Sequence, residues 1–73
     1  MSEQAKFLID SLVEQLAVWA MKDYSLSMTE ALQLVFNSQL YDKVVDLDTG
    51  LYYQSAAYNY GLLKHELVYG KLG

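Results

Sequence analysis

The chain has no cysteine, no proline and no arginine among its 73 residues. Without cysteine there are no disulfides, thiolate metal sites or cysteine nucleophiles. A secreted domain of this size usually needs such staples, so we expect a reducing, cytoplasmic location. Without proline no helix is forced to end, and helix boundaries must come from Gly, Asn, Asp and Ser.

Positive charge is scarce. Five lysines stand singly against nine acidic residues, and the formal net charge is −4. Nucleic-acid binding depends on clustered positive charge, so we predict no nucleic-acid partner and no attraction to an anionic membrane surface. The longest apolar run, residues 16–21, is far below the ~20 residues that span a bilayer. The start of the chain lacks the basic residues of a signal peptide, so we expect no membrane partner and no targeting segment.

Apolar residues are plentiful, at 53% of the chain, which is too many for a disordered protein. The length suits one domain over residues 1–73. In residues 3–22, apolar side chains recur at three- and four-residue steps, the period of one helical face, and Ser2 is placed to cap that helix. We therefore predict an all-α fold, a compact bundle of three main helices plus a short helical turn.

The remaining elements follow from local signals. Ser27 and Glu30 fit a capping box, which starts a second helix near Met28. Residues 39–46 fit a short helix, with a strand as the alternative because Val44 and Val45 are β-branched.

Residues 46–50 form a turn in which Gly50 can take a positive φ, and residues 51–53 run extended or continue the loop. Ser55 caps a last helix over residues 56–69, which Gly70 ends. Gly61 inside that helix would be explained by a close helix crossing, with chance as the alternative. The predicted core comprises Leu8, Ile9, Leu12, Leu16, Trp19, Leu32, Val35, Phe36, Tyr60, Leu63 and Leu67.

Motifs with chemical meaning are weak. Residues 48–50 read Asp-Thr-Gly, the core of an aspartic protease, but that chemistry needs two such carboxylates on a β-rich scaffold. Asp46 and Asp48 have the spacing of the first two ligands of an EF-hand calcium loop. That loop requires glycine at its sixth position, whereas Gly50 falls at the fifth. His65 is the sole histidine and has no nameable orienting partner. We predict no catalytic residue, no cofactor and no metal.

The tyrosines are the unusual feature, since five of the seven lie between residues 51 and 70. A tyrosine ring combines a large apolar face with one polar tip, and it is enriched in binding interfaces. Phe7 and Val18 fall off the main stripe of the first helix and suggest a second apolar face that another chain covers. The predicted contact residues are Phe7, Val18, Tyr52, Tyr53, Tyr58 and Tyr69.

Residues 46–55, followed by Tyr58, Tyr60, Leu63 and Glu66, together with residues 26–32, resemble a family of small uncharacterised helical proteins of gut-type bacteria. Some proteins of this kind are encoded beside toxin-like genes, including ADP-ribosyltransferase-like ones. The resemblance implies an antitoxin or an accessory partner in a bacterial operon. It implies no functional residue.

These observations predict a non-enzymatic protein–protein interaction module that associates with itself as a homodimer or binds a neighbouring gene's product. One alternative is a small-molecule-binding or enzymatic helical domain, with a pocket around Asp46, Asp48 and His65. Another is a DNA-binding repressor in which the first two helices form a helix-turn-helix, although the basic recognition face is missing.

Overall fold

A computed structural model describes residues 2–72, which contain helices and connecting turns and no β-strand. The helices in chain order are α1 (Glu3–Tyr24), α2 (Met28–Phe36), α3 (Gln39–Val45) and α4 (Ala56–Tyr69), with the 3₁₀ turns η1 (Leu47–Thr49) and η2 (Leu51–Tyr53) between α3 and α4. The all-α prediction is confirmed, and residues 39–45 form a helix. No helix in residues 2–72 has the length and apolar character that a membrane crossing requires.

A serine starts each of the four helices. In each case its side-chain oxygen accepts a hydrogen bond from the backbone N–H three residues further on, which satisfies a donor that the first turn leaves free. The four capping residues are Ser2, Ser27, Ser38 and Ser55. Three of them are predicted from the sequence, whereas the role of Ser38 is not.

Helix ends depend on left-handed backbone. Gly70 closes α4 with a φ of 77°, as predicted. Ser25 closes α1 with a φ of 54° and is the one non-glycine residue of the described chain with positive φ. A residue with a Cβ is strained in the left-handed region, so Ser25 adopts an unfavourable backbone conformation to end α1.

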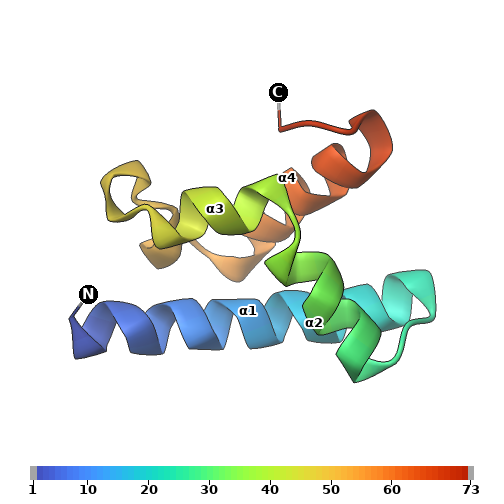
Figure 1. Ribbon diagram of the computed structural model, residues 1–73, viewed down its shortest axis with the longest axis horizontal. Helices are drawn as coiled ribbons and strands as arrows, with labels where there is room; N and C mark the ends of the chain where they lie inside the picture. The colour runs from blue at the N-terminus through green and yellow to red at the C-terminus, as the bar shows by residue number, and fades with distance from the viewer. Residues whose placement is uncertain (1, 73) are drawn as a thin grey trace.

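The longest helix, α1, is the base on which the other elements lie (Figure 1). At 1.5 Å per residue its 22 residues span about 33 Å, which matches the longest extent of the molecule, 33 Å. The chain turns at residues 25–27, and α2 folds back across the second half of α1. α1 also contacts η2 and α4, while α3 lies against α4 and η2.

Small side chains line the crossing of α1 and α2. Ala17 and Ala20 of α1 and Ala31 of α2 are all fully buried. Alanine brings two helix backbones close because it has no bulk beyond Cβ, so these residues set the separation of the helices. The apolar periodicity of the sequence does not show this close approach, which is why the predicted core omits Ala17.

The core extends from this crossing to the other helices. Leu40 and Val44 of α3 are completely enclosed, although the predicted core contains no residue of that segment. Six predicted core residues are buried: Ile9, Leu12, Leu16, Val35, Tyr60 and Leu63. Four others are half-buried at its edge: Leu8, Trp19, Leu32 and Leu67.

Phe36 is a wrong core prediction, because its side chain is 48% exposed. Ala31 and Val35 face α1, and a residue directly after Val35 projects about a hundred degrees away from that direction. The Phe36 ring lies instead edge-on to Tyr41, with 5.0 Å between the ring centroids. It therefore covers the start of α3 from outside.

Tyr60 joins the last helix to the end of the first. Its hydroxyl donates a 2.6 Å hydrogen bond to the Asp23 carboxylate, and its ring lies 5.3 Å from that of Trp19. The Lys64 ammonium lies 5.7 Å from the centroid of the same ring. Burial raises the pKa of Tyr60 well above its ordinary value, and the hydrogen bond to Asp23 and the negative charge of Asp23 raise it further.

Candidate interaction surfaces

One surface lies where η2 meets the first half of α1. Two adjoining hollows, of about 260 and 250 Å³, share Leu8, Tyr52 and Tyr53 among their lining residues. Gln4 lines one hollow and Ser11 the other. We call Phe7, Leu8, Tyr52 and Tyr53 the aromatic patch.

Phe7 belongs to this surface by its helical position. It lies between Gln4 and Ser11 on the outside of α1, since residues three and four apart are neighbours on a helix. Its side chain is 69% exposed. Val18 points to the same side, but lies about 16 Å further along α1 and is half-buried. Phe7 is therefore a helical neighbour of two residues that line the hollows, although it lines neither hollow itself, and Val18 lies apart from them.

The loop before α4 holds the two tyrosines in place. Their rings meet edge-to-face, with centroids 5.0 Å apart. The ring of Tyr53 lies over Gly50, where an added Cβ would come within 2.8 Å of the tyrosine hydroxyl oxygen. Gly50 has a φ of 70°, so both its backbone and its neighbour favour glycine. Residues 51–53 form a 3₁₀ turn, where the sequence predicts an extended or irregular segment.

Asn59 anchors this loop to α4. It is completely buried, and its amide nitrogen donates to the carbonyls of Leu51 and Ser55 at 3.0 and 3.1 Å. Its side-chain oxygen accepts no hydrogen bond from the described residues. The buried amide therefore fixes the path of the chain that carries the aromatic patch.

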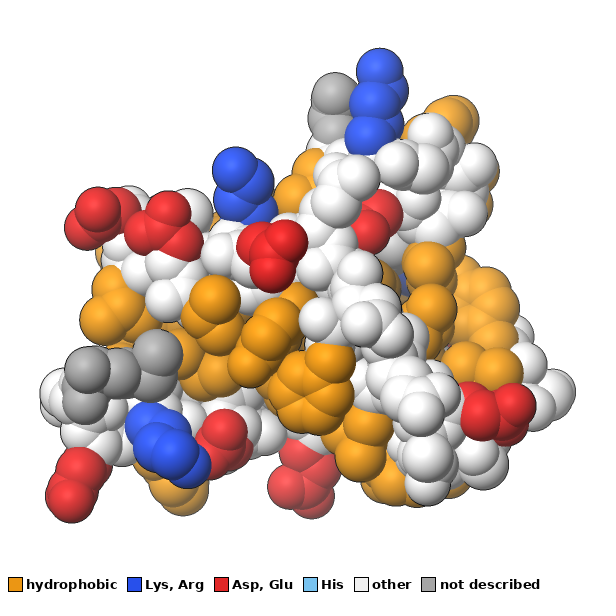
Figure 2. Space-filling view, viewed as in Figure 1, with side chains coloured by type: hydrophobic (Ala, Val, Ile, Leu, Met, Phe, Trp, Pro, Cys, Tyr) orange, Lys and Arg blue, Asp and Glu red, His pale blue; other side chains and the backbone are white. Residues whose placement is uncertain are grey.

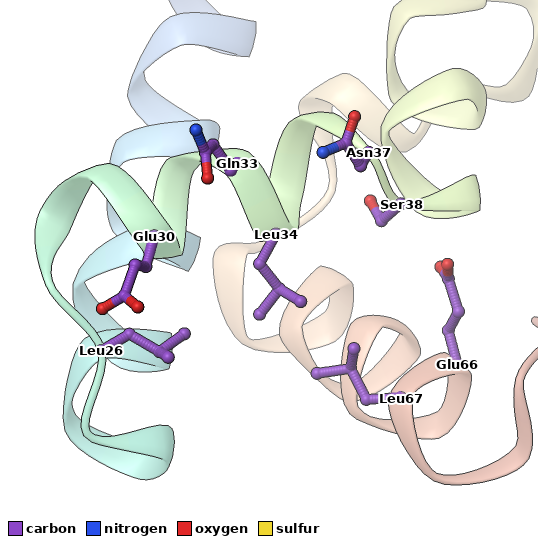
Figure 3. A pocket seen from close by; sticks show the side chains of 8 residues that line it. All are labelled: Leu26, Glu30, Gln33, Leu34, Asn37, Ser38, Glu66 and Leu67. Carbon is purple, nitrogen blue, oxygen red and sulfur yellow. The ribbon is translucent and has the colours of Figure 1, made fainter.

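A second surface is an open groove of about 500 Å³ between α2 and α4 (Figure 3). The side chains of Leu34 and Leu67 point toward one another across it, and Leu26 lies at the α1–α2 turn, to their left in the view. Polar groups from the helix ends complete the lining: Glu30, Gln33, Asn37, Ser38 and Glu66.

Both carboxylates at this groove are engaged within the chain. Glu66 accepts hydrogen bonds from the backbone N–H groups of Gln39 and Leu40, at 2.7 and 3.0 Å. Glu30 accepts one from the backbone N–H of Ser27 at 2.9 Å. This bond is the main reason why the pKa of Glu30 lies below its ordinary value, and a hydrogen bond with the Ser27 hydroxyl is the second. The groove is therefore lined by carboxylates that already cap helices.

A third surface is the outer side of α4. Tyr58, Val68 and Tyr69 have exposed fractions of 55%, 70% and 67%. Gly61 and His65 are exposed on the same side, while Leu62 is half-buried at its edge. An added Cβ at Gly61 would meet no atom within 4 Å, so the predicted close helix crossing at this glycine is wrong within the chain.

His65 lies in the middle of that outer side. Its ring is 4.5 Å from the ring of Tyr69, and its Nδ1 lies 3.1 Å from the carbonyl oxygen of Lys71. A carbonyl oxygen accepts only, so Nδ1 carries the proton in this contact. The imidazole is thus held to its own helix end.

The residues of the alternative small-molecule site do not converge. Asp46 and Asp48 lie at the end of α3, where the Asp46 carboxylate accepts from the Asp48 backbone N–H at 3.1 Å. His65 lies one residue from Glu66, which contacts the start of α3 instead. None of the three hollows described above is lined by these residues.

The face shown in Figure 2 has a continuous band of hydrophobic side chains along the junction between α1 and the elements above it, with acidic side chains on either side. A further apolar area borders α2 at the opposite end of that face. Apolar surface is therefore spread over several parts of the chain. Comparison of the chain with protein-family models, curated proteins and solved structures finds no match.

Proposed function

We propose that this chain is a non-enzymatic protein-binding module of the cytoplasm, with α1, α2 and α4 as the three main helices of its scaffold. The aromatic patch is the observation that carries the proposal. Tyr53 is 64% exposed and lines both hollows, which an apolar side chain of a partner can fill. Phe7 is 69% exposed and is the helical neighbour of the lining residues Gln4 and Ser11. Exposed aromatic rings beside a hollow are typical of the centre of a protein interface.

The rigidity of the patch supports this role. Tyr52 and Tyr53 stand on a single 3₁₀ turn, which Gly50 and the buried Asn59 hold in one conformation. A pre-arranged surface loses little conformational entropy when a partner binds. The patch is therefore suited to a specific partner.

The partner we propose is a protein encoded next to this one. The resemblance of residues 26–32 and 46–55 to small bacterial proteins found beside toxin-like genes supports an antitoxin or accessory role. Small-molecule binding or catalysis around Asp46, Asp48 and His65 stays the alternative, with less support. The two aspartates lie at the end of α3, whereas the His65 imidazole contacts the carbonyl oxygen of Lys71 after α4.

The test is binding of the purified neighbouring gene product, measured by titration calorimetry. We expect a complex with the wild-type chain and at least a tenfold weaker one with the double variant Phe7→Ser, Tyr53→Ser. The matched control is Tyr24→Ser, which removes another exposed ring, at the end of α1. Equal affinity of the double variant and the wild-type chain would contradict the role of the patch, provided that circular dichroism shows both folded.

A further inference from the structure

The outer side of α4 has the spacing of a helix-pairing seam. Tyr58, Gly61, His65 and Val68 follow each other at steps of three, four and three residues, and all four are exposed. This is the a/d pattern by which two helices pack along a shared stripe. We call these four residues the α4 seam. Tyr69, 67% exposed, lies beside it.

The order of residues in the seam suits a second copy of itself. In an antiparallel pair, the 3-4-3 spacing places Tyr58 opposite Val68 of the other chain and Gly61 opposite His65. Each contact then occurs twice about a two-fold axis, as in an isologous dimer. A large side chain faces a smaller one in every pair, which favours interdigitation.

Gly61 supports the packing of another helix against the α4 seam. Glycine inside a helix costs about 1 kcal/mol relative to alanine. Nothing in residues 2–72 requires it here, because its backbone φ is not positive and an added Cβ would meet no described atom within 4 Å. A glycine on an exposed stripe does let another helix approach closely, and in this pairing His65 of the second chain lies opposite it.

Charge favours a second copy over a basic partner. The chain carries a formal net charge of −4, yet no carboxylate or ammonium belongs to the seam. Lys64 lies by the Tyr60 ring, and Glu66 is turned toward the start of α3. Two acidic chains can therefore meet along this stripe without placing like charges directly opposite one another.

We propose that two copies of this chain associate through antiparallel pairing of their α4 seams. The inference rests on the proposed function, since self-association is one form of protein binding, but it uses a different surface. The seam and Tyr69 offer roughly 400–500 Å² per chain, near the lower limit of specific interfaces. The dimer should therefore be weak, with a dissociation constant of about 10 µM or above.

The first experiment is the mass of the full chain by sedimentation equilibrium over a dilution series. We expect it to rise from 8.3 kDa toward twice that value, about 17 kDa. Gly61→Lys should weaken association at least tenfold without lowering the melting temperature, because the site is open within the chain. Thr29→Lys adds the same charge at an exposed position of α2 and should behave as wild type.

The second experiment fixes the register. Since the chain has no cysteine, introduced thiols are the only ones present. A mixture of the variants Tyr58→Cys and Val68→Cys should oxidise mainly to the mixed disulfide, and each variant alone should stay largely unlinked. Equal or faster self-linking of Tyr58→Cys would overturn the antiparallel pairing.

Two other results would overturn the inference. One is a wild-type mass of 8.3 kDa up to about 1 mM protein. The other is loss of association in the variant Phe7→Ser, Tyr53→Ser, with association unchanged in Gly61→Lys. That second result would leave the proposed function standing, because the aromatic patch would then be the contact between copies.

Discussion

The carboxylate of Glu66 in α4 accepts a 2.7 Å hydrogen bond from the backbone N–H of Gln39, twenty-seven residues earlier in the chain. A second bond, from Leu40, makes this one side chain a cap for two free donors of α3. Negative charge is also favourable at that helix end. A tertiary contact therefore completes a local structure that Ser38 begins.

Removing this cap should destabilise the fold. Glu66→Ala leaves two backbone donors without their partner and should lower the free energy of unfolding by about 1–2 kcal/mol. Glu66→Gln keeps one accepting oxygen and should lose about half as much. Urea unfolding followed by circular dichroism measures both. Glu14→Ala, an exposed carboxylate of α1, is the control, and an equal loss in that variant would contradict the capping role.

Tyr60 should make stability depend on high pH. Because burial and Asp23 raise the pKa of Tyr60 in the folded chain, its contribution is complete below the ordinary tyrosine value near 10 and is lost as pH rises above it. The unfolded chain releases that proton first. Tyr60→Phe should lower stability by about 1 kcal/mol at pH 7 and reduce the decline above pH 10. The midpoints of urea unfolding, measured from pH 7 to 11, test this pH dependence. If the stability of Tyr60→Phe falls above pH 10 as steeply as that of the wild-type chain, Tyr60 is not its cause.

Ser25 offers a stabilising change. Its φ of 54° is one that glycine adopts freely and an L side chain does not. Ser25→Gly should raise the free energy of unfolding by about 0.5–1 kcal/mol, whereas Ser25→Val should lower it. Thermal unfolding of both variants checks the opposite signs. A lower melting temperature for the glycine variant means that the serine side chain has another role.

Ala31 should not tolerate a larger side chain. Its Cβ lies fully buried in the crossing of α1 and α2, so Ala31→Leu must push the helices apart at a cost of about 1–3 kcal/mol. Thr29→Leu is the matched control on the exposed side of α2 and should change stability by less than about 0.5 kcal/mol. Equal denaturant midpoints for the two variants would contradict the prediction, because they would mean that the crossing of α1 and α2 accommodates a leucine at position 31.

The helices are predictable because residues close in sequence determine where each helix begins and ends. Ser27 and Glu30 form the expected capping box, and the bounds of α4 agree with the prediction from Ser55 and Gly70. Such signals depend on residues three or four positions apart, so they need no knowledge of the fold.

The packing partners were less predictable. Ala17 belongs to the core only because two helices cross there, and Phe36 lies outside the core because its position on α2 directs it away from α1. The contact between Glu66 and the start of α3 spans twenty-seven residues and has no sequence pattern of its own. The clustering of tyrosines in residues 51–70 is visible in the sequence, whereas the groove between α2 and α4 joins residues that only the fold brings together.

The dependence of α3 on Glu66 also bears on the order in which the molecule assembles. A helix of seven residues is too short to persist alone in water, since nucleation costs more than so few hydrogen bonds return. By contrast, α1 and α2 are joined by a three-residue turn and can pair as neighbours in sequence. We expect α3 to become stable only after α4 has docked, and its amide protons to exchange with solvent sooner than those in the middle of α1.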